Sequence, residues 1–482
     1  MKPILLTFLL LLTLQSGWAQ CVELYPPSTY TTVRYPNGDF RASGGPLPYN
    51  GLTGTYNFYS GDIGNHSDWT NKSDHMDFLI KTDGTLWGMG FNTYGQLGNC
   101  STNPVYVEHV LINSDTDWKY ISPSAHCLAL KNNGTLWSWG LNDYGQLGNG
   151  NNTNSCAITQ VGTDSDWVKV YTFERESFAI KSNGTLWMWG YLSYGHAGDG
   201  TIPATNVTNQ RTTPQQIGTD TDWADVKANY DGVIALKTNG TIWTWGKGIQ
   251  GTLGSSTRTT IDKFIPMQMG TENDWSLISV STGCLALKNN GTIWAWGFNF
   301  CFALGISTSQ IYYYTPLQIG SDNDWIFIRT SYNDRPYHPL YTNSSYGVNS
   351  IAQKLNENFY GWGYNRDGII GILPYEQYFY TPTLKTFPNC ALSTTSQTFL
   401  QDVIIAPNPT KDLIKINYNL KEKSELTFVL SNNIGQQLYS FIINNEFGAN
   451  QETIDLSKYP VGIYFLNINT DGTQKTIKVL KN

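Results

Sequence analysis

Apolar and polar residues alternate along most of the chain in short runs, and each run ends at a turn. The segment ALKNNGTLWSWG (129–140) is typical, with an apolar run, an Asn-Gly turn and a second apolar run. Asn-Gly between two such runs favours a β-hairpin, because a type I′ turn needs positive φ at both central residues. These segments lack the 3.6-residue period of a helix, so the pattern predicts an all-β protein.

The same hairpin recurs about every 50 residues. Its turns begin at Asn37, Asp83, Asn133, Asn183, Asn239, Asn290 and Asn356, with the first and last copies the weakest. A repeat of this length accommodates four strands of about five to six residues. One small antiparallel sheet repeated about an axis is a propeller blade. The repeats therefore predict a seven-bladed β-propeller over residues 20–390.

The 17 tryptophans follow the repeat. One set lies in Asp-Trp before a strand, a second directly follows the hairpin turn, and a third comes two residues later. Two such residues, Trp137 and Trp139, share one face of a strand. Outside the signal no tryptophan is left over for an exposed glycan-binding groove, so we expect all of these to pack in the core.

The N-terminus carries the pattern of an export signal. A lysine at position 2 precedes an apolar run over 4–14, and Ala19 is followed by Gln20. We expect cleavage between these two residues, which makes 1–19 a signal peptide. Lipidation of Cys21 is the competing interpretation, but Gln20 and Trp18 do not fit a lipobox. The mature chain has no apolar stretch long enough to span a membrane.

Seven cysteines enter a compartment that permits disulfides. Cys21 and Cys390 flank the repeats and are a candidate pair. Cys127 and Cys284 occupy equivalent positions in CLALKNNG, where we expect small buried hydrophobic residues. No CxxC pair supports zinc.

The last eighty residues have a different pattern. After a polar linker at 391–402 tryptophan disappears, and alternating runs such as LIKINYNL and GIYFLNIN follow. Such runs, bounded by Asn, Gly and Pro, predict a small immunoglobulin-like β-sandwich over 403–482.

Catalytic motifs are absent from the sequence. A net charge of -7 leaves no basic surplus for nucleic acid. No histidine has metal-ligand spacing, and we expect His126 to be a satisfied structural residue. We therefore predict no catalytic residue, no metal and no cofactor. Pairs of acidic residues such as Asp115 and Asp117 leave calcium binding as an alternative interpretation, although two carboxylates fall short of the six to eight oxygen ligands of calcium. Asp also favours turns.

The segment DWKYISPSAHCLALKNNGTLWSWGLNDYGQLGNG (117–150) resembles the repeat of the regulator of chromosome condensation family. The resemblance covers about residues 30–385 and implies a seven-bladed propeller with a broad protein-binding face. Members include a nucleotide exchange factor for a nuclear GTPase, plant photoreceptors and a secreted bacterial inhibitor of β-lactamases.

The C-terminal segment resembles the sorting domain of type IX secretion cargo of Bacteroidetes. The matching features are Ala406-Pro407-Asn408-Pro409, LSKYPVGIYFLNI (456–468) and a terminal KVLK. This resemblance implies export across the outer membrane through the secretion machinery. Removal of the domain, with release or surface attachment, usually follows.

We therefore expect a monomeric, non-enzymatic binding protein, secreted or on the outer cell surface, whose propeller recognises another macromolecule. Interfaces favour amphipathic aromatics, which makes Tyr312, Tyr313 and Tyr314 candidate contacts. Strand packing explains the same three residues equally well. The alternatives are guanine nucleotide exchange, which export from the cytosol disfavours, and inhibition of an extracellular enzyme.

Overall fold

The structure is a computed structural model. It describes residues 23–25, 31–34, 40–43, 69–70, 78–101, 103, 105–192, 195–201, 209–248, 250–255, 262–308, 310–332, 348–355, 358–365, 378–384, 400–407, 410–420, 424–432, 437–445, 448–470 and 473–481. The predicted cleavage site at Ala19 and Gln20 and the candidate pair Cys21 and Cys390 lie outside these residues. The chain divides into two compact units, within Leu24–Phe387 and Pro388–Asn482.

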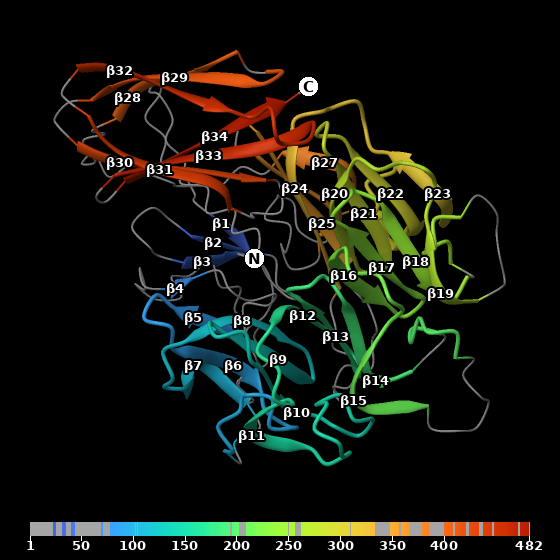
Figure 1. Ribbon diagram of the computed structural model, residues 1–482. Coiled ribbons are helices and arrows are strands. Elements are labelled where there is room, and N and C mark those ends of the chain that lie inside the picture. The colour runs from blue at the N-terminus through green and yellow to red at the C-terminus, as the bar shows by residue number, and fades with distance from the viewer. Residues whose placement is uncertain are drawn as a thin grey trace, which may run out of the picture. The chain divides into compact units, whose positions relative to one another are not determined.

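The first unit contains six four-stranded antiparallel sheets, each formed by four strands consecutive in the chain (Figure 1). The first three sheets comprise β4 (Trp69–Thr70), β5 (Phe78–Lys81), β6 (Leu86–Phe91), β7 (Val105–Asn113); β8 (Trp118–Pro123), β9 (His126–Lys131), β10 (Leu136–Gly140), β11 (Ser155–Gln160); β12 (Trp167–Phe173), β13 (Glu176–Lys181), β14 (Leu186–Tyr191) and β15 (Gln210–Gln216).

The next three comprise β16 (Trp223–Asn229), β17 (Gly232–Lys237), β18 (Ile242–Gly246), β19 (Lys263–Gln268); β20 (Trp275–Val280), β21 (Gly283–Lys288), β22 (Ile293–Phe298), β23 (Tyr312–Gln318); β24 (Trp325–Tyr332), β25 (Val348–Lys354), β26 (Phe359–Tyr364) and β27 (Tyr378–Leu384). A short 3-10 helix, η1 (Phe300–Phe302), follows β22.

A three-stranded sheet precedes these six sheets. It consists of β1 (Glu23–Tyr25), β2 (Thr31–Arg34) and β3 (Phe40–Ser43). Strands β2 and β3 pair across the predicted first turn, while the turn itself lies outside the described residues. The predicted turn at Asn356 also lies outside them. The seven-blade count therefore stays a prediction.

The predicted hairpins are confirmed in register, but the predicted type I′ turn is wrong. Of residues 132–134 only Gly134 has positive φ, and its N–H donates to the Lys131 backbone oxygen at 3.0 Å. The connection is therefore a type I turn followed by a left-handed glycine. In the second sheet Leu136 pairs with Leu130 and Trp137 with Ala129, so the chain reverses at the Asn-Gly turn. Gly134 has a φ of +80°. A Cβ at this position would lie 2.1 Å from the backbone oxygen of Ser165, so both conformation and space require glycine.

The tryptophans of the third set join successive sheets. Trp139 is fully buried, and its Nε1 donates a hydrogen bond to the backbone oxygen of Gln96 in the preceding sheet's turn at 2.7 Å. Four further indoles make the equivalent bond: Trp189 to Gln146, Trp245 to His196, Trp296 to Thr252 and Trp362 to Ala303. The core is therefore continuous between neighbouring sheets, as predicted for stacked repeats.

The second unit consists of two antiparallel sheets. One has the order β28-β29-β32 and the other β31-β30-β33-β34. Its strands are β28 (Leu400–Ala406), β29 (Leu413–Leu420), β30 (Ser424–Asn432), β31 (Gln437–Asn445), β32 (Gly448–Asp455), β33 (Gly462–Thr470) and β34 (Thr473–Lys481). Strand β28 begins within the predicted linker 391–402.

Both sheets of this unit contribute to one core. Ile414 and Ile416 from β29 pack with Phe428 from β30 and Leu466 from β33. Lys481 at the end of β34 is buried, and its Nζ donates to the backbone oxygens of residues 456, 457 and 459 at 2.7, 3.2 and 2.8 Å. The lysine of the terminal KVLK thus anchors the chain end to the LSKYP turn.

Candidate functional site

The pairs of aspartates that we considered as calcium ligands form ion pairs with a lysine of the same repeat. Lys131 Nζ lies 2.7 Å from Asp115 Oδ2 and 3.0 Å from Asp117 Oδ1. The ammonium also lies over the rings of Trp118 and Trp137, 5.0 and 4.9 Å from their centroids. Its charge therefore neutralises the carboxylates and contacts two aromatic faces.

This arrangement, which we call the lysine cage, is repeated. The equivalent lysines are Lys181, Lys237 and Lys354, each with two aspartates, and Lys288, which pairs with Asp274. Burial opposes the charge of Lys131, but its hydrogen bonds to Asp115 and Asp117 outweigh burial and raise its pKa. The Asp-x-Asp motif is therefore a partner for lysine. Among the described residues, no group of three or more His, Cys, Asp or Glu could hold a metal ion.

The Asn-Gly-Thr turns also have a structural explanation. Trp137 Nε1 donates to Thr135 Oγ1 at 2.9 Å, and Thr135 Oγ1 donates to Asn133 Oδ1 at 2.7 Å. The tryptophans that follow the turns are partly buried, with the cage lysine over one ring face, and Trp137, Trp187, Trp243 and Trp294 pack against the buried core, as predicted.

The buried polar residues are held by structural bonds. His126 Nε2 lies 2.8 Å from Ser177 Oγ, and Ser177 Oγ donates to the Gln146 backbone oxygen at 2.7 Å. Burial lowers the pKa of His126 to about 3, so the ring is neutral at physiological pH. His196 Nδ1 lies 2.9 Å from both oxygens of the buried Glu176 carboxylate.

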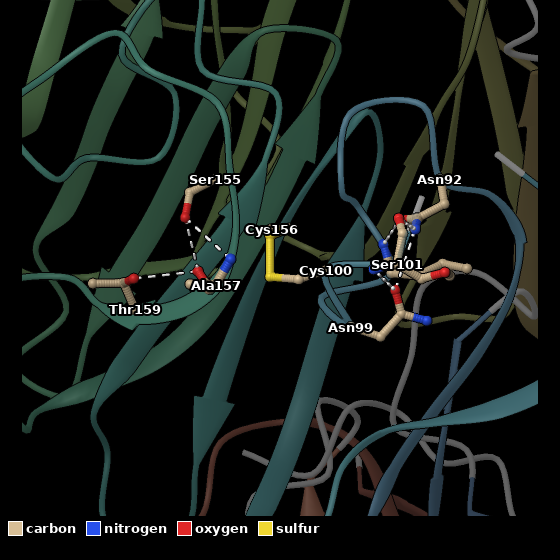
Figure 2. The surroundings of a disulfide bond; sticks show 9 residues. Asn92, Asn99, Cys100, Ser101, Ser155, Cys156, Ala157 and Thr159 are labelled. Atoms are coloured by element: carbon tan, nitrogen blue, oxygen red, sulfur yellow. Dashed lines mark hydrogen bonds between the residues drawn. A yellow bond between two sulfur atoms is a disulfide. The ribbon is translucent and has the colours of Figure 1, made fainter. Parts of the chain in front are cut away.

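One disulfide was not anticipated from the sequence. Cys100, in the loop after β6, is bonded to Cys156 in β11 of the next sheet (Figure 2). Cys127 and Cys284 are buried free thiols, as expected. A local pattern could not reveal the bond, because it joins a loop of one sheet to a strand of the next, and these meet only when the sheets stack.

The three candidate tyrosines have different environments. Tyr313 is only 9% exposed and packs in the core of its sheet. Its hydroxyl is hydrogen-bonded to Thr308 Oγ1. Tyr312 and Tyr314 are partly exposed, with ring centroids 6.4 Å apart. Strand packing therefore explains Tyr313, and only its two neighbours remain candidate contacts.

Tyr312 belongs to a larger group of aromatic side chains. It pairs with Phe298 across β22 and β23, and their rings stack with centroids 5.2 Å apart. In the next sheet Tyr364 pairs with Tyr378 at the same register, and their centroids are 4.7 Å apart. The same cross-strand aromatic pair thus occurs in two consecutive sheets.

Residues of η1 connect the two pairs. Phe300 lies 5.4 Å from Phe298, and Phe302 lies 4.4 Å from Tyr380 and 5.8 Å from Tyr378, centroid to centroid. Tyr378 and Tyr380 are 39% and 48% exposed. We call this group the aromatic rim: Phe298, Phe300, Phe302, Tyr312, Tyr314, Tyr364, Tyr378 and Tyr380.

Phe302 stands where the other repeats have glycine. In four equivalent turns Gly95, Gly145, Gly195 and Gly251 have φ between +75° and +83°. Phe302 adopts the same left-handed conformation with a φ of +61°. For a bulky residue this costs on the order of 1–3 kcal/mol. The departure of FNFCFALG from LNDYGQLG is the sequence signal that could have pointed to the rim.

Three family models match four segments of the chain. The secretion system C-terminal sorting domain matches residues 404–482. Two models describe the regulator of chromosome condensation (RCC1) repeat. One matches residues 124–146, and the other matches residues 83–117 and 239–285. No curated protein matches the chain. Within the described residues, no helix has the length and apolarity needed to cross a membrane.

Solved propellers are similar in fold. Human WBSCR16 is 21% identical, with a TM-score of 0.57 over 72% of this chain and 90% of that one. Prp20p from Saccharomyces cerevisiae, in a structure reported with its binding to Gsp1p and histones, is 16% identical over 64% and 75%, with a TM-score of 0.54. Yeast RCC1 (Prp20), which Kap60 binds, is 15% identical over 64% and 73%, with a TM-score of 0.55.

At these identities the likeness to solved structures establishes the fold alone. The repeat matches fall on strands of the first unit, among them β6, β7, β9, β10 and β18, and the sorting-domain match falls on the second unit. The sorting domain indicates type IX secretion and a secreted or cell-surface location. The chain therefore contains regulator of chromosome condensation repeats and ends in a secretion system C-terminal sorting domain.

Proposed function

We propose that this protein is a non-enzymatic binding protein of the cell exterior, whose repeat unit recognises another macromolecule through the aromatic rim. The observation that carries the proposal is the exposure of Tyr378 and Tyr380 beside a phenylalanine held in an unfavourable backbone conformation. Large exposed aromatics grouped on one surface are typical of interaction sites.

The polar groups outside the rim are better explained by structural roles than by catalysis. The lysine cages are closed by their own carboxylates, His126 is buried in a bond to Ser177 of the next sheet, and Glu176 is buried against His196 of its own repeat. A general acid or base must reach its substrate within hydrogen-bonding distance. The rim is thus the better candidate for function than these groups.

The domain plan belongs to the same proposal. Residues 1–19 direct the chain out of the cytoplasm, 20–390 form a closed seven-bladed ring, and 403–482 form an immunoglobulin-like sandwich that engages the export machinery. The chain acts as a monomer. Guanine nucleotide exchange needs a cytosolic GTPase, whereas the sorting domain directs this chain outside the cell. Inhibition of an extracellular enzyme is a special case of binding.

A comparison of two purified full-length mature chains tests the proposal. The wild type and the variant Tyr378→Ala/Tyr380→Ala are incubated with washed producing cells and their extracellular material, and the bound fraction is quantified. We expect saturable binding of the wild type and a loss of about tenfold or more in the variant, as for a central aromatic contact. Equal binding of both chains, at equal melting temperature, would exclude the rim.

A further inference from the structure

We propose that the aromatic rim binds an uncharged glycan chain, with sugar rings stacked on its tyrosine and phenylalanine side chains. The proposal rests on the proposed function, since it names the ligand class of the same site. We infer the ligand class from three properties of the rim. Its described segments carry no charge, its rings present aromatic faces and phenolic hydroxyls, and its aromatic pairs are absent at the equivalent positions of other sheets.

The rim carries no formal charge. The described residues of 298–318, 359–365 and 378–384 include no Lys, Arg, Asp or Glu. Phosphate, sulfate or carboxylate groups on a ligand require cationic partners such as arginine. Aromatic faces also attract cations, but where this chain holds a cation against them, in the lysine cage, it adds carboxylates, which these segments lack. Charge complementarity therefore selects an uncharged ligand.

Sugar rings match the chemistry that remains. The face of an aromatic ring carries the negative part of its quadrupole and attracts C–H groups. A sugar presents C–H groups on its ring faces and hydroxyls around its edge. Tyrosine hydroxyls both donate and accept hydrogen bonds. Burial and the neighbouring Cys301 thiol raise the pKa of Tyr378, so this phenol keeps its proton at neutral pH.

A protein partner fits this surface less well. Specific protein interfaces bury about 800 Å² on each partner and are enriched in arginine as well as aromatics. The rim has aromatics from two successive sheets and no arginine among its described segments. A glycan chain needs only a succession of ring faces, which the pairs at Tyr312 and Tyr378 supply.

The fold itself does not need these aromatics. At the position of the Phe298–Tyr312 pair, other sheets have Tyr191 with Gln210 and Phe91 with Val105. Those sheets form the same ladder without an aromatic pair. The glycine that Phe302 replaces would also be easier for the backbone. Packing alone therefore does not explain why this side of two consecutive sheets is aromatic.

Phe302→Gly is the sharpest variant, because it restores the residue used by the equivalent turns. It removes a ring from the rim and relieves the left-handed φ, so the fold should be retained. Tyr380→Ala removes an exposed ring from the same group. Ile265→Ala is the matched control, since Ile265 is 54% exposed on β19, the outer strand of another sheet.

The probes are soluble neutral polysaccharides, namely hydroxyethyl cellulose, glucomannan and dextran, with anionic alginate as comparison. The full mature chain is run in native gels that contain each polysaccharide, and mobility gives the dissociation constant. We expect at least one neutral polysaccharide to retard the wild type, with no retardation by alginate. Phe302→Gly and Tyr380→Ala should weaken this binding about tenfold or more at an unchanged or higher melting temperature, and Ile265→Ala should bind like the wild type.

Three results would overturn the glycan assignment: no retardation by any neutral polysaccharide, equal retardation by alginate, or unchanged binding in both rim variants. Its failure is distinguishable from failure of the proposed function. If the wild type binds an extracellular protein through Tyr378 and Tyr380 but no polysaccharide, only the ligand class is wrong. If the rim variants bind extracellular material as the wild type does, the rim is not the site.

Discussion

Trp139 Nε1 donates a hydrogen bond to the backbone oxygen of Gln96 at 2.7 Å, across the junction of two successive sheets. The indole is fully buried, so the bond lies in the continuous core between the sheets. The same bond recurs at four further junctions, which makes it the regular connection between repeats.

Trp139→Ala should lower the free energy of unfolding by about 3–5 kcal/mol, because it removes a fully buried ring. Trp139→Phe keeps most of the ring and should cost about 1 kcal/mol for the hydrogen bond, plus the lost volume. Trp137→Phe is the control, since its indole bonds only to Thr135 within its own hairpin. Chemical denaturation measures all three. A loss for Trp137→Phe as large as that for Trp139→Ala would contradict the assigned roles.

The lysine cage predicts a loss of stability in alkali. The pKa of Lys131 is raised above its ordinary value of 10.5 by Asp115 and Asp117. The folded state therefore holds this proton more tightly than the unfolded state. The stabilisation is complete below pH 10.5 and is lost as pH rises through the raised pKa.

Lys131→Met should be less stable than the wild type at neutral pH, and the difference in unfolding free energy should shrink above pH 10.5. Lys131→Arg separates charge from cage geometry, because arginine stays charged in this range. Urea denaturation at a series of pH values tests this. A difference between wild type and Lys131→Met that is constant with pH would show that titration of the cage does not contribute.

The Cys100–Cys156 bond should stabilise the junction of the first two four-stranded sheets. The double variant Cys100→Ser/Cys156→Ser should lose about 2–5 kcal/mol, mainly because the unfolded chain gains freedom. Cys284→Ser serves as control for replacing a buried free thiol. Thermal unfolding with and without reductant measures the effect. Reductant should not change the melting temperature of the double variant through this bond. A wild-type melting temperature that stays the same when reductant cleaves the bond would contradict the prediction.

The sorting domain should need its terminal lysine in order to fold. Lys481→Met leaves the backbone oxygens of residues 456, 457 and 459 without this donor, and because that of Leu456 is buried the cost is about 1–3 kcal/mol. Lys415→Met replaces an exposed lysine of the same unit and should be neutral. Deletion of 403–482 should leave the protein in the periplasm, and Lys481→Met should reduce the exported fraction. Fractionation that finds the deleted form outside the cell would overturn the sorting assignment.

The sequence predicts those features that depend on local, repeated chemistry. The Asn-Gly turns and the tryptophan positions require only short-range patterns, and the structure confirms them in register. The ion pairs of Asp115 and Asp117 were harder to predict from the sequence, because their partner Lys131 follows 14–16 residues later on another strand.

Contacts between repeats were still harder to predict from the sequence. Alternation places Tyr313 on the opposite face of its strand from Tyr312 and Tyr314, but it does not reveal which face packs in the core. The contact of Phe302 with Tyr380 and the Cys100–Cys156 bond join residues 78 and 56 positions apart, which meet only when sheets stack. Alternation along one strand carries no information about its neighbour in the next sheet.

Photocrosslinking from the aromatic rim tests the central claim most directly. A benzophenone amino acid replaces Tyr380 in the full mature chain, and a control chain carries it at the exposed Ile265. Benzophenone inserts into C–H bonds, so it reports protein and glycan ligands alike. Irradiation on the surface of producing cells should yield a discrete crosslinked species from position 380 and none from position 265. Equal crosslinking at both positions, or none at position 380, would contradict a binding site at the rim.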